Sequence, residues 1–322
     1  MPRSSPGSVA ALLLGLALAA PARAQSLDSL VVRLAQMSAV TGMEDAMADT
    51  LRALLPGAAT DRAGNVVLVH GNGLPVRVIA CPLDERGYVV GGITPDGYLS
   101  LRRVDTSAVG PLHNQWLEGQ RVTVFGRRGA VPGVVGVRST HLTRGRSAGA
   151  DEPFNLDNAW VDVGARTAAE VATLGIAVLA PVTRAKRVHR YGPAGSLLAG
   201  VSIAQRAVCA ALVSAVRRTT TSGGSTIVAF VRRQHFANAG MGFLLNSYPA
   251  AAEAVLLGGI GSDTLGTEPG IVTDSVSAGT WMRHVTRWTI AARYAGTPAE
   301  TVARMDVEGL ERRIADWLGG VR

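Results

Sequence analysis

One apolar strand and the two acids behind it constrain the fold of this chain most. Residues 76–80 read VRVIA, with four apolar residues out of five, and the chain then continues through Pro82 to Asp84 and Glu85. A nearly continuous apolar run of this kind is typical of a central strand whose sheet is covered on both faces. Open α/β sheets bind their ligands at the carboxyl ends of such strands. We therefore expect Asp84 and Glu85 to lie at the ligand-binding edge of an α/β sheet.

A long β-rich interruption divides the α/β pattern. Amphipathic helices are predicted within 27–56, and helix and strand patterns return after about Leu197. Between them, short β-like segments alternate with turn signals such as Asp-Gly and Pro-Gly, which is typical of a small barrel. The sequence therefore predicts a three-layer α/β domain formed by residues 25–86 and 198–322, with residues 87–197 inserted as a small β-barrel domain.

The N-terminus predicts export. Arg3 is followed by the apolar run VAALLLGLALAA and then by Ala22-Arg23-Ala24, an A-x-A cleavage pattern. The run is too short to span a bilayer comfortably. We expect residues 1–24 to be a signal peptide, with a secreted or periplasmic mature chain and no membrane span after cleavage. An uncleaved anchor is the alternative.

The charge and cysteine content narrow the choice of partners. The chain carries a net charge of +8 and few aromatic residues, and its basic residues are scattered apart from RAKRVHR at 184–190. This distribution argues against nucleic-acid binding, and the basic run is interpreted as a solvated loop. Cys81 and Cys209 are either a disulfide, which export would permit, or two buried free thiols.

Five motifs, in one order and at compatible spacing, resemble the glutamyl or tetrahedral aminopeptidases. These are dinuclear-zinc exopeptidases, sometimes described as cellulases or endoglucanases. The motifs are TGMEDAM (41–47), DRAGNVV (61–67), LDERGYVVGGITPDGYL (83–99), VGVRSTHL (135–142) and WVDVGARTAAEVATLGI (160–176). The resemblance covers most of the mature chain. It implies a zinc-exopeptidase-like α/β domain, an insert that mediates homo-oligomerisation, and two zinc ions.

The same resemblance places the family's metal ligands at positions where this chain carries other residues. Pro82 stands at the first zinc-binding histidine, and Cys81 could replace it only through a one-residue slip, which reverses the side chain. The other positions are held by Ala204 and Gln205 (the metal-bridging Asp-Asp), Arg232, Arg233 and Gln234 (the segment with the general base), Leu257 or Gly258 (an aspartate), and Gly296 (the last histidine).

This loss favours a homologue without catalysis. Zinc lowers the pKa of bound water to about 7, far below that of bulk water, and no cluster of arginines supplies that effect. Arginine stays protonated and cannot act as a general base. We expect no retained zinc, and a role in binding a peptide in the old cleft or in assembly through the insert. The alternative is an active metallo-aminopeptidase with a rebuilt or misaligned metal site.

Two further roles are assigned to residues by their position at the old site. Because an unpaired buried carboxylate is costly, Arg232 or Arg233 is hypothesised to pair with Asp84 and to stand in for the metal charge. His235 lies near the same place and is the candidate for residual chemistry.

Overall fold

The computed structural model describes residues 26–105, 109, 113–136, 154–220, 223–261, 271–275 and 285–320. The predicted signal peptide lies outside the described residues. Within them, no helix is both long enough and apolar enough to cross a bilayer.

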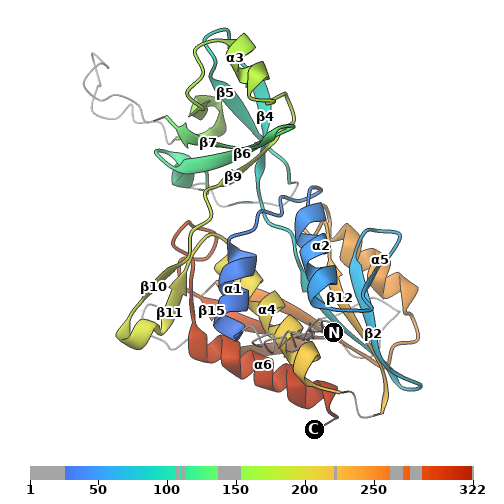
Figure 1. Cartoon of the computed structure of the whole chain (residues 1–322). Coiled ribbons are helices and arrows are strands. Elements are labelled where there is room, and N and C mark those ends of the chain that lie inside the picture. Colours follow the sequence, from blue (N-terminus) through green and yellow to red (C-terminus); the bar gives the residue numbers. More distant parts are fainter. Residues whose placement is uncertain are drawn as a thin grey trace, which may run out of the picture.

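A mixed seven-stranded sheet forms the centre of the larger domain (Figure 1). Its middle strands run parallel to one another, and the strands at both edges are antiparallel to their neighbours. In spatial order the strands are β1 (Ala59–Thr60), β2 (Val66–Asn72), β12 (Gly224–Val231), β3 (Val76–Pro82), β13 (Glu253–Gly261), β15 (Val285–Ala292) and β14 (Ile271–Ser275). The apolar run from which β3 was predicted therefore lies in the middle of the sheet.

Helices cover both faces of this sheet, as a three-layer fold requires. One core packs β3 against α1 (Leu27–Ala35), α2 (Asp45–Leu54), α4 (Ile203–Arg218) and α6 (Arg304–Leu318), and a second packs it against α5 (Ala239–Ser247). Along β3, Ile79 and Cys81 belong to the first core, and Val78 and Ala80 to the second. This alternation is the period of two expected of a strand buried on both sides.

The predicted barrel insert is confirmed. Six antiparallel strands close a barrel that has its own apolar core (Figure 1). In order around the barrel they are β4 (Tyr88–Ile93), β5 (Leu99–Arg103), β8 (Trp160–Asp162), β7 (Gly129–Val135), β6 (Arg121–Gly126) and β9 (Pro181–Arg184). The insert also carries α3 (Ala168–Thr173) and the 3-10 turns η1 (His113–Leu117) and η2 (Leu156–Asn158).

The chain returns from the barrel through a small sheet. β10 (His189–Tyr191) pairs with β11 (Leu197–Ala199), which pairs with β16 (Thr301–Ala303) ahead of α6, and η3 (Pro193–Gly195) joins the first two strands. The basic run 184–190 therefore spans the end of β9, a short connection and β10, and the solvated loop predicted for it is wrong in part.

A disulfide decides between the alternatives left open for the two cysteines. Cys81 at the end of β3 and Cys209 in α4 are joined, with their Cα atoms 5.7 Å apart. The bond ties the central strand to the helix that packs over it, next to the edge where Asp84 and Glu85 lie.

Candidate functional site

A cavity of about 180 Å³ lies where the carboxyl edge of the sheet meets the barrel. Residues 84–86 after β3, the start of α4, the end of β13 and the loop after β15 form the sheet side of its wall. His113 and Arg184 line it from the insert. Both the edge of a parallel sheet and the junction of two domains are preferred places for ligand binding.

The structure gathers most of the residues assigned from the sequence around this cavity. Those that line it are Asp84, Glu85, Ala204, Gln205, His235 and Gly296. Pro82 and Gln234 line a neighbouring groove, which also includes Gln205. Arg232 and Arg233 line neither space.

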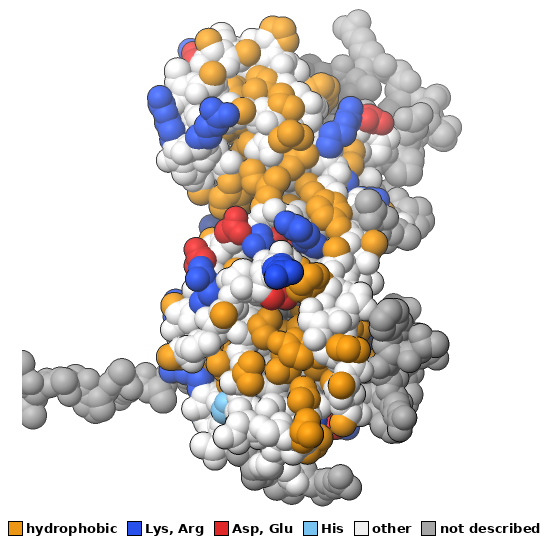
Figure 2. All heavy atoms as spheres, turned by 90° about the vertical axis from the view of Figure 1, so that its right-hand side faces the viewer, with side chains coloured by type: hydrophobic (Ala, Val, Ile, Leu, Met, Phe, Trp, Pro, Cys, Tyr) orange, Lys and Arg blue, Asp and Glu red, His pale blue; other side chains and the backbone are white. Residues whose placement is uncertain are grey.

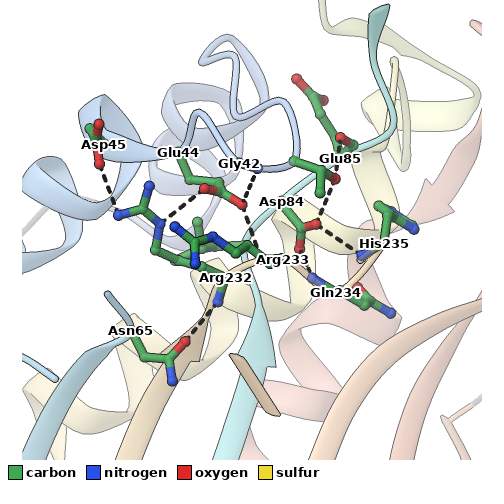
Figure 3. A network of polar contacts seen from close by, with 12 residues as sticks. Gly42, Glu44, Asp45, Asn65, Asp84, Glu85, Arg232, Arg233, Gln234 and His235 are labelled. Carbon is green, nitrogen blue, oxygen red and sulfur yellow. Dashed lines mark hydrogen bonds and ion pairs between the residues drawn. The ribbon is translucent and has the colours of Figure 1, made fainter. Parts of the chain in front are cut away.

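Asp84 is buried, and donors other than arginine satisfy its carboxylate. The Thr41 hydroxyl donates to Oδ2 at 2.7 Å, and the backbone N–H groups of Gln234 and His235 donate at 3.0 and 3.2 Å (Figure 3). The hypothesis that Arg232 or Arg233 pairs with Asp84 is therefore wrong. The physical reason is a turn: Arg233 has a left-handed backbone (φ 57°), and the chain beyond it presents N–H groups to the carboxylate.

Arg232 instead forms an ion-pair group with the turn before α2 (Figure 3). Its Nε lies 2.9 Å from Glu44 Oε2, and its Nη1 lies 2.8 Å from Asp45 Oδ1. The backbone N–H groups of Gly42 and Arg233 donate to the other oxygen of Glu44, at 2.9 and 3.0 Å. We call Arg232, Glu44 and Asp45 the Arg232 cluster.

Glu85 forms a second, sealed group with two cations. Arg206 Nη2 lies 3.2 Å from Glu85 Oε2, Lys186 Nζ contacts the same oxygen, and Ala39 N–H donates to Oε1 at 3.0 Å. The side chains of Glu85 and Arg206 are 1% exposed and that of Lys186 is 6% exposed. We call Glu85, Lys186 and Arg206 the Glu85 cluster.

Two opposing effects, burial and the attraction between opposite charges, set the pKa values in the Glu85 cluster. Burial alone would raise the pKa of the Glu85 carboxyl, but the neighbouring Lys186 and Arg206 outweigh burial and hold the pKa below its ordinary value. Burial lowers the pKa of Lys186, and Arg206 adds to that effect against the attraction of Glu85. Lys186 is the only lysine of the chain. A buried lysine was not expected, because the run that contains it was interpreted as solvated.

Glu300 is a further acid in the wall, which no motif marked. It accepts the Ala204 N–H at 2.9 Å and the Gly296 N–H at 2.8 Å, one on each carboxylate oxygen. Burial raises its pKa above the ordinary value, against those two hydrogen bonds. It thus holds the start of α4 and the loop after β15 together at positions where the resemblance places metal ligands.

The acids of the cavity wall are engaged by protein donors, which bears on the two zinc ions that the fold family implies. Catalytic zinc takes about three protein ligands from histidine, cysteine or carboxylate groups. Each acid of the wall, namely Asp84, Glu85 and Glu300, already accepts hydrogen bonds or ion pairs from protein donors. No three such groups are arranged to hold a metal within the described ranges.

A larger groove of about 620 Å³ continues from the cavity. Its wall shares Gln205 and Gly259 with the cavity. Apolar side chains of α5, β13 and β15 form part of the rest, namely Met241, Leu245, Leu256, Leu257 and Val285, and the polar side chains are Gln234, Asn238, Arg287 and Thr289. On the face shown in Figure 2, hydrophobic side chains form a band that runs from the barrel over the α/β domain. Charged side chains gather on that face where the two domains meet.

Comparison with known sequences identifies relatives of this chain. SgcX of Escherichia coli strain K12 is 30% identical over 207 residues, which cover 61% of this chain and 52% of SgcX. The lysyl aminopeptidase of Pyrococcus furiosus is 31% identical over 137 residues, which cover 42% of this chain and 38% of that enzyme. The match therefore spans about half or less of the length of these curated relatives.

Solved structures share the fold at low sequence identity. The TET1 peptidase of Pyrococcus horikoshii, which can assemble into a tetrahedron or a large octahedral shell, superposes with a TM-score of 0.79 at 18% identity, covering 91% of this chain and 99% of that one. An aminopeptidase of the archaeon Desulfurococcus kamchatkensis gives 0.76 at 19% identity, covering 91% and 94%. An endoglucanase of Thermotoga maritima gives 0.70 at 17% identity, covering 90% and 96%. These likenesses show the three-layer domain with its barrel insert.

The family is shown by a match to the sequence model of the M42 glutamyl aminopeptidases. That match covers residues 64–233, which is more than half of the chain. It includes β3, the barrel and some of the residues that line the groove. The chain belongs to the M42 glutamyl aminopeptidase family.

Proposed function

We propose that this protein is an exported, non-catalytic member of its family that binds peptides in the former catalytic cleft. One observation carries the proposal. At the positions that the resemblance gives to metal ligands stand Pro82, Ala204 and Gly296, which have no ligand side chain, and the acids nearby are engaged by protein donors. Without an activated water, the cleft retains shape and polarity but lacks the main source of hydrolytic power.

The continuous cavity and groove support peptide binding. The cavity offers charged and hydrogen-bonding groups, and the groove offers an apolar surface beside it. Ligand sites commonly combine a largely apolar wall with a few placed polar groups. A short peptide with one polar end and apolar side chains matches this division.

The test is zinc stoichiometry together with peptide binding and turnover. The chain of residues 25–322 would be incubated with excess Zn²⁺ and freed of loose metal, and its zinc content measured by elemental analysis. We expect close to zero zinc per chain, no release of amino acids from a peptide library, and measurable binding of some of those peptides. The lysyl aminopeptidase named above serves as the positive control for metal and turnover.

The alternative function is an active metallo-aminopeptidase with a rebuilt site. Two imidazoles, those of His113 and His235, line the same cavity, and this observation favours it. One or two tightly held ions per chain, with turnover that a chelator abolishes, would establish the alternative and refute the non-catalytic proposal.

Assembly and export form the rest of the proposal. The barrel carries exposed large apolar side chains, including Tyr98, Trp116, Val134 and Trp160, which suit an interface between copies of the chain. We expect light scattering to give a mass several times that of one chain.

Export with cleavage after Ala24 predicts a mature protein whose N-terminal sequencing begins at Gln25.

A further inference from the structure

We propose that the cavity binds the terminal carboxylate of a peptide, with Arg184 as its principal ligand, and that the preceding side chains of the peptide lie in the groove. This inference rests on the proposed function and deepens it. It reverses the polarity expected of an aminopeptidase fold, because it assigns the carboxyl end of the peptide, and not the amino end, to the cavity.

Arg184 supplies the first observation. It is the last residue of β9 and reaches the cavity wall from the barrel side. Its Nε and Nη2 atoms are buried and have no hydrogen-bond partner among the described residues. Buried donors are normally satisfied, and leaving them unpaired is costly. Nε and one Nη of a guanidinium are adjacent donors that match the two oxygens of a carboxylate.

The acids of the same wall are already engaged by the protein. Asp84 accepts one hydroxyl and two backbone N–H groups, Glu300 accepts two backbone N–H groups, and Glu85 lies between Lys186 and Arg206. The hydrogen bonds and ion pairs of these acids come from groups other than Arg184, although the charge of Glu85 also attracts Arg184. Arg86 adds a second guanidinium to the lining of the cavity.

The titration of His113 supports a positive potential in the cavity. The pKa of His113 is lowered from 6.5 to about 4, first by burial and then by the charges of Arg184, Arg86 and Arg103, against the attraction of Asp105. Among these charges, Arg184 has the largest effect on His113, so a positive group of the wall acts on a position inside the cavity. A carboxylate bound to Arg184 would offset that effect, whereas the ammonium group of a peptide N-terminus would add to it.

The dimensions fit one end of a peptide. A cavity of about 180 Å³ admits a carboxylate together with part of the residue that carries it, since a cavity of about 150 Å³ can hold benzene, and it joins a groove of about 620 Å³ through Gln205 and Gly259. Gly259 allows β13 to approach the start of α4 closely at this place, because a Cβ atom there would lie 2.6 Å from the Cβ of Ala204. The apolar wall of the groove suits Leu or Met side chains in the residues before the terminus.

The experiment compares ligands that differ in one group. Calorimetric titrations of the mature chain would use N-acetyl-Leu-Leu with a free carboxylate, the same peptide as its C-terminal amide, Leu-Leu-amide with a free amine, and inorganic phosphate. We expect the acid to bind at least about tenfold more tightly than either amide, because only the acid forms a charge-assisted pair with Arg184. On binding of the acid, the pKa of His113 followed by NMR is expected to rise.

Variants assign the preference to Arg184. Arg184→Gln should abolish the difference between acid and amide, and Arg184→Lys should restore part of it, since lysine keeps the charge but not the paired donors. Arg187→Gln, a change of an exposed arginine in the same segment that does not line the cavity, should leave the difference unchanged. If Arg184→Gln does not fold, Arg184→Lys and the wild-type comparison still decide.

The outcomes separate the two proposals. Equal binding of acid and amide would overturn the carboxylate site and leave peptide binding intact. Tight binding of phosphate with no peptide preference would also overturn it, in favour of a site for a free oxyanion. Failure of all peptides to bind would overturn the proposed function as well.

Discussion

The Arg232 cluster and the Glu85 cluster have opposite arrangements of charge. In the first, one cation lies between two acids, and in the second, one acid lies between two cations. The first opens to water, because the Asp45 side chain is 83% exposed, whereas every side chain of the second is nearly sealed. Both follow strand ends at the same edge of the sheet, after β12 and β3.

The contrast shows how exposure to water sets the contribution of an ion pair to the stability of the fold. Attraction between exposed charges is largely screened by water, so such pairs contribute little. A sealed pair gains more attraction but has lost its hydration, so the removal of one partner leaves an expensive buried charge. Substitutions in the two clusters therefore test, within one protein, how the loss of stability depends on the burial of the charge, from the buried Glu85 to the exposed Asp45.

The largest effect is expected for Glu85→Gln. The change leaves Lys186 and Arg206 buried beside each other without their counter-ion, and we expect a loss of about 3–5 kcal/mol in the free energy of unfolding, measured by urea denaturation. The double variant Glu85→Gln, Lys186→Met should recover part of the loss. A loss below about 1 kcal/mol for the single variant would contradict the sealed character of the cluster.

A smaller loss is expected for Arg232→Met. Glu44 then remains buried without its cation but keeps the N–H groups of Gly42 and Arg233, so we expect a loss of about 2 kcal/mol in the same measurement. The matched control is Arg233→Met, which removes an exposed side chain and keeps the backbone N–H that binds Glu44. Equal losses for the two variants would refute the assignment of Arg232 as the partner of Glu44.

We expect acid to lower the free energy of unfolding through groups on the side of the molecule that holds the Glu85 cluster. His113, in the basic cavity beside it, has its pKa lowered from 6.5 to about 4, so the unfolded chain takes up this proton at a higher pH than the folded chain. The free energy of unfolding should therefore fall as the pH decreases from about 6.5 to about 4, by about 1–2 kcal/mol after allowance for the half-buried position of His113.

Replacement of His113 isolates its contribution to the pH dependence of the free energy of unfolding. His113→Gln should flatten the loss between pH 6.5 and 4 in thermal or urea unfolding at a series of pH values. Glu85, whose pKa is lowered, should still cause a loss below its ordinary pKa near 4.5, because its contribution disappears as the carboxylate is protonated. An unchanged profile in the variant would contradict the assigned origin.

The smallest effect is expected for Asp45→Asn. Asp45 contacts Arg232 from a highly exposed position, so we expect a change of about 0.5 kcal/mol or less, reduced further in high salt. A loss above about 1.5 kcal/mol would show that the Arg232 cluster is less open to water than its geometry indicates.

The fold could be predicted from local pattern, and the site only in part. The apolar run of β3 and the turn signals of the barrel are local, and both elements form where they were expected. The partner of Arg232 could not be predicted, because Glu44 lies far away in the sequence and meets it only when the turn before α2 meets the segment after β12. No periodicity encodes such a contact.

Arg184, Lys186 and His113 were missed for a related reason. Their burial depends on how the barrel sits against the edge of the sheet, and Lys186 meets Glu85 across 101 residues of sequence. A run of basic residues is usually solvated, so only the partner reveals the exception. The positions assigned by resemblance, such as Ala204 and Gly296, were brought to the cavity because the start of α4 and the loop after β15 lie at the same edge of the sheet regardless of the side chains they carry.

The burial of Lys186 gives the protein an unusual selectivity toward chemical labels. Lysine ε-amines are the usual targets of acylating reagents, and this chain has one, sealed in the native state. An active ester should therefore modify the folded protein only at its α-amino terminus. The rate at which Lys186 is acylated would then report how often the junction of sheet and barrel opens, because Lys186 is the single lysine that opening exposes.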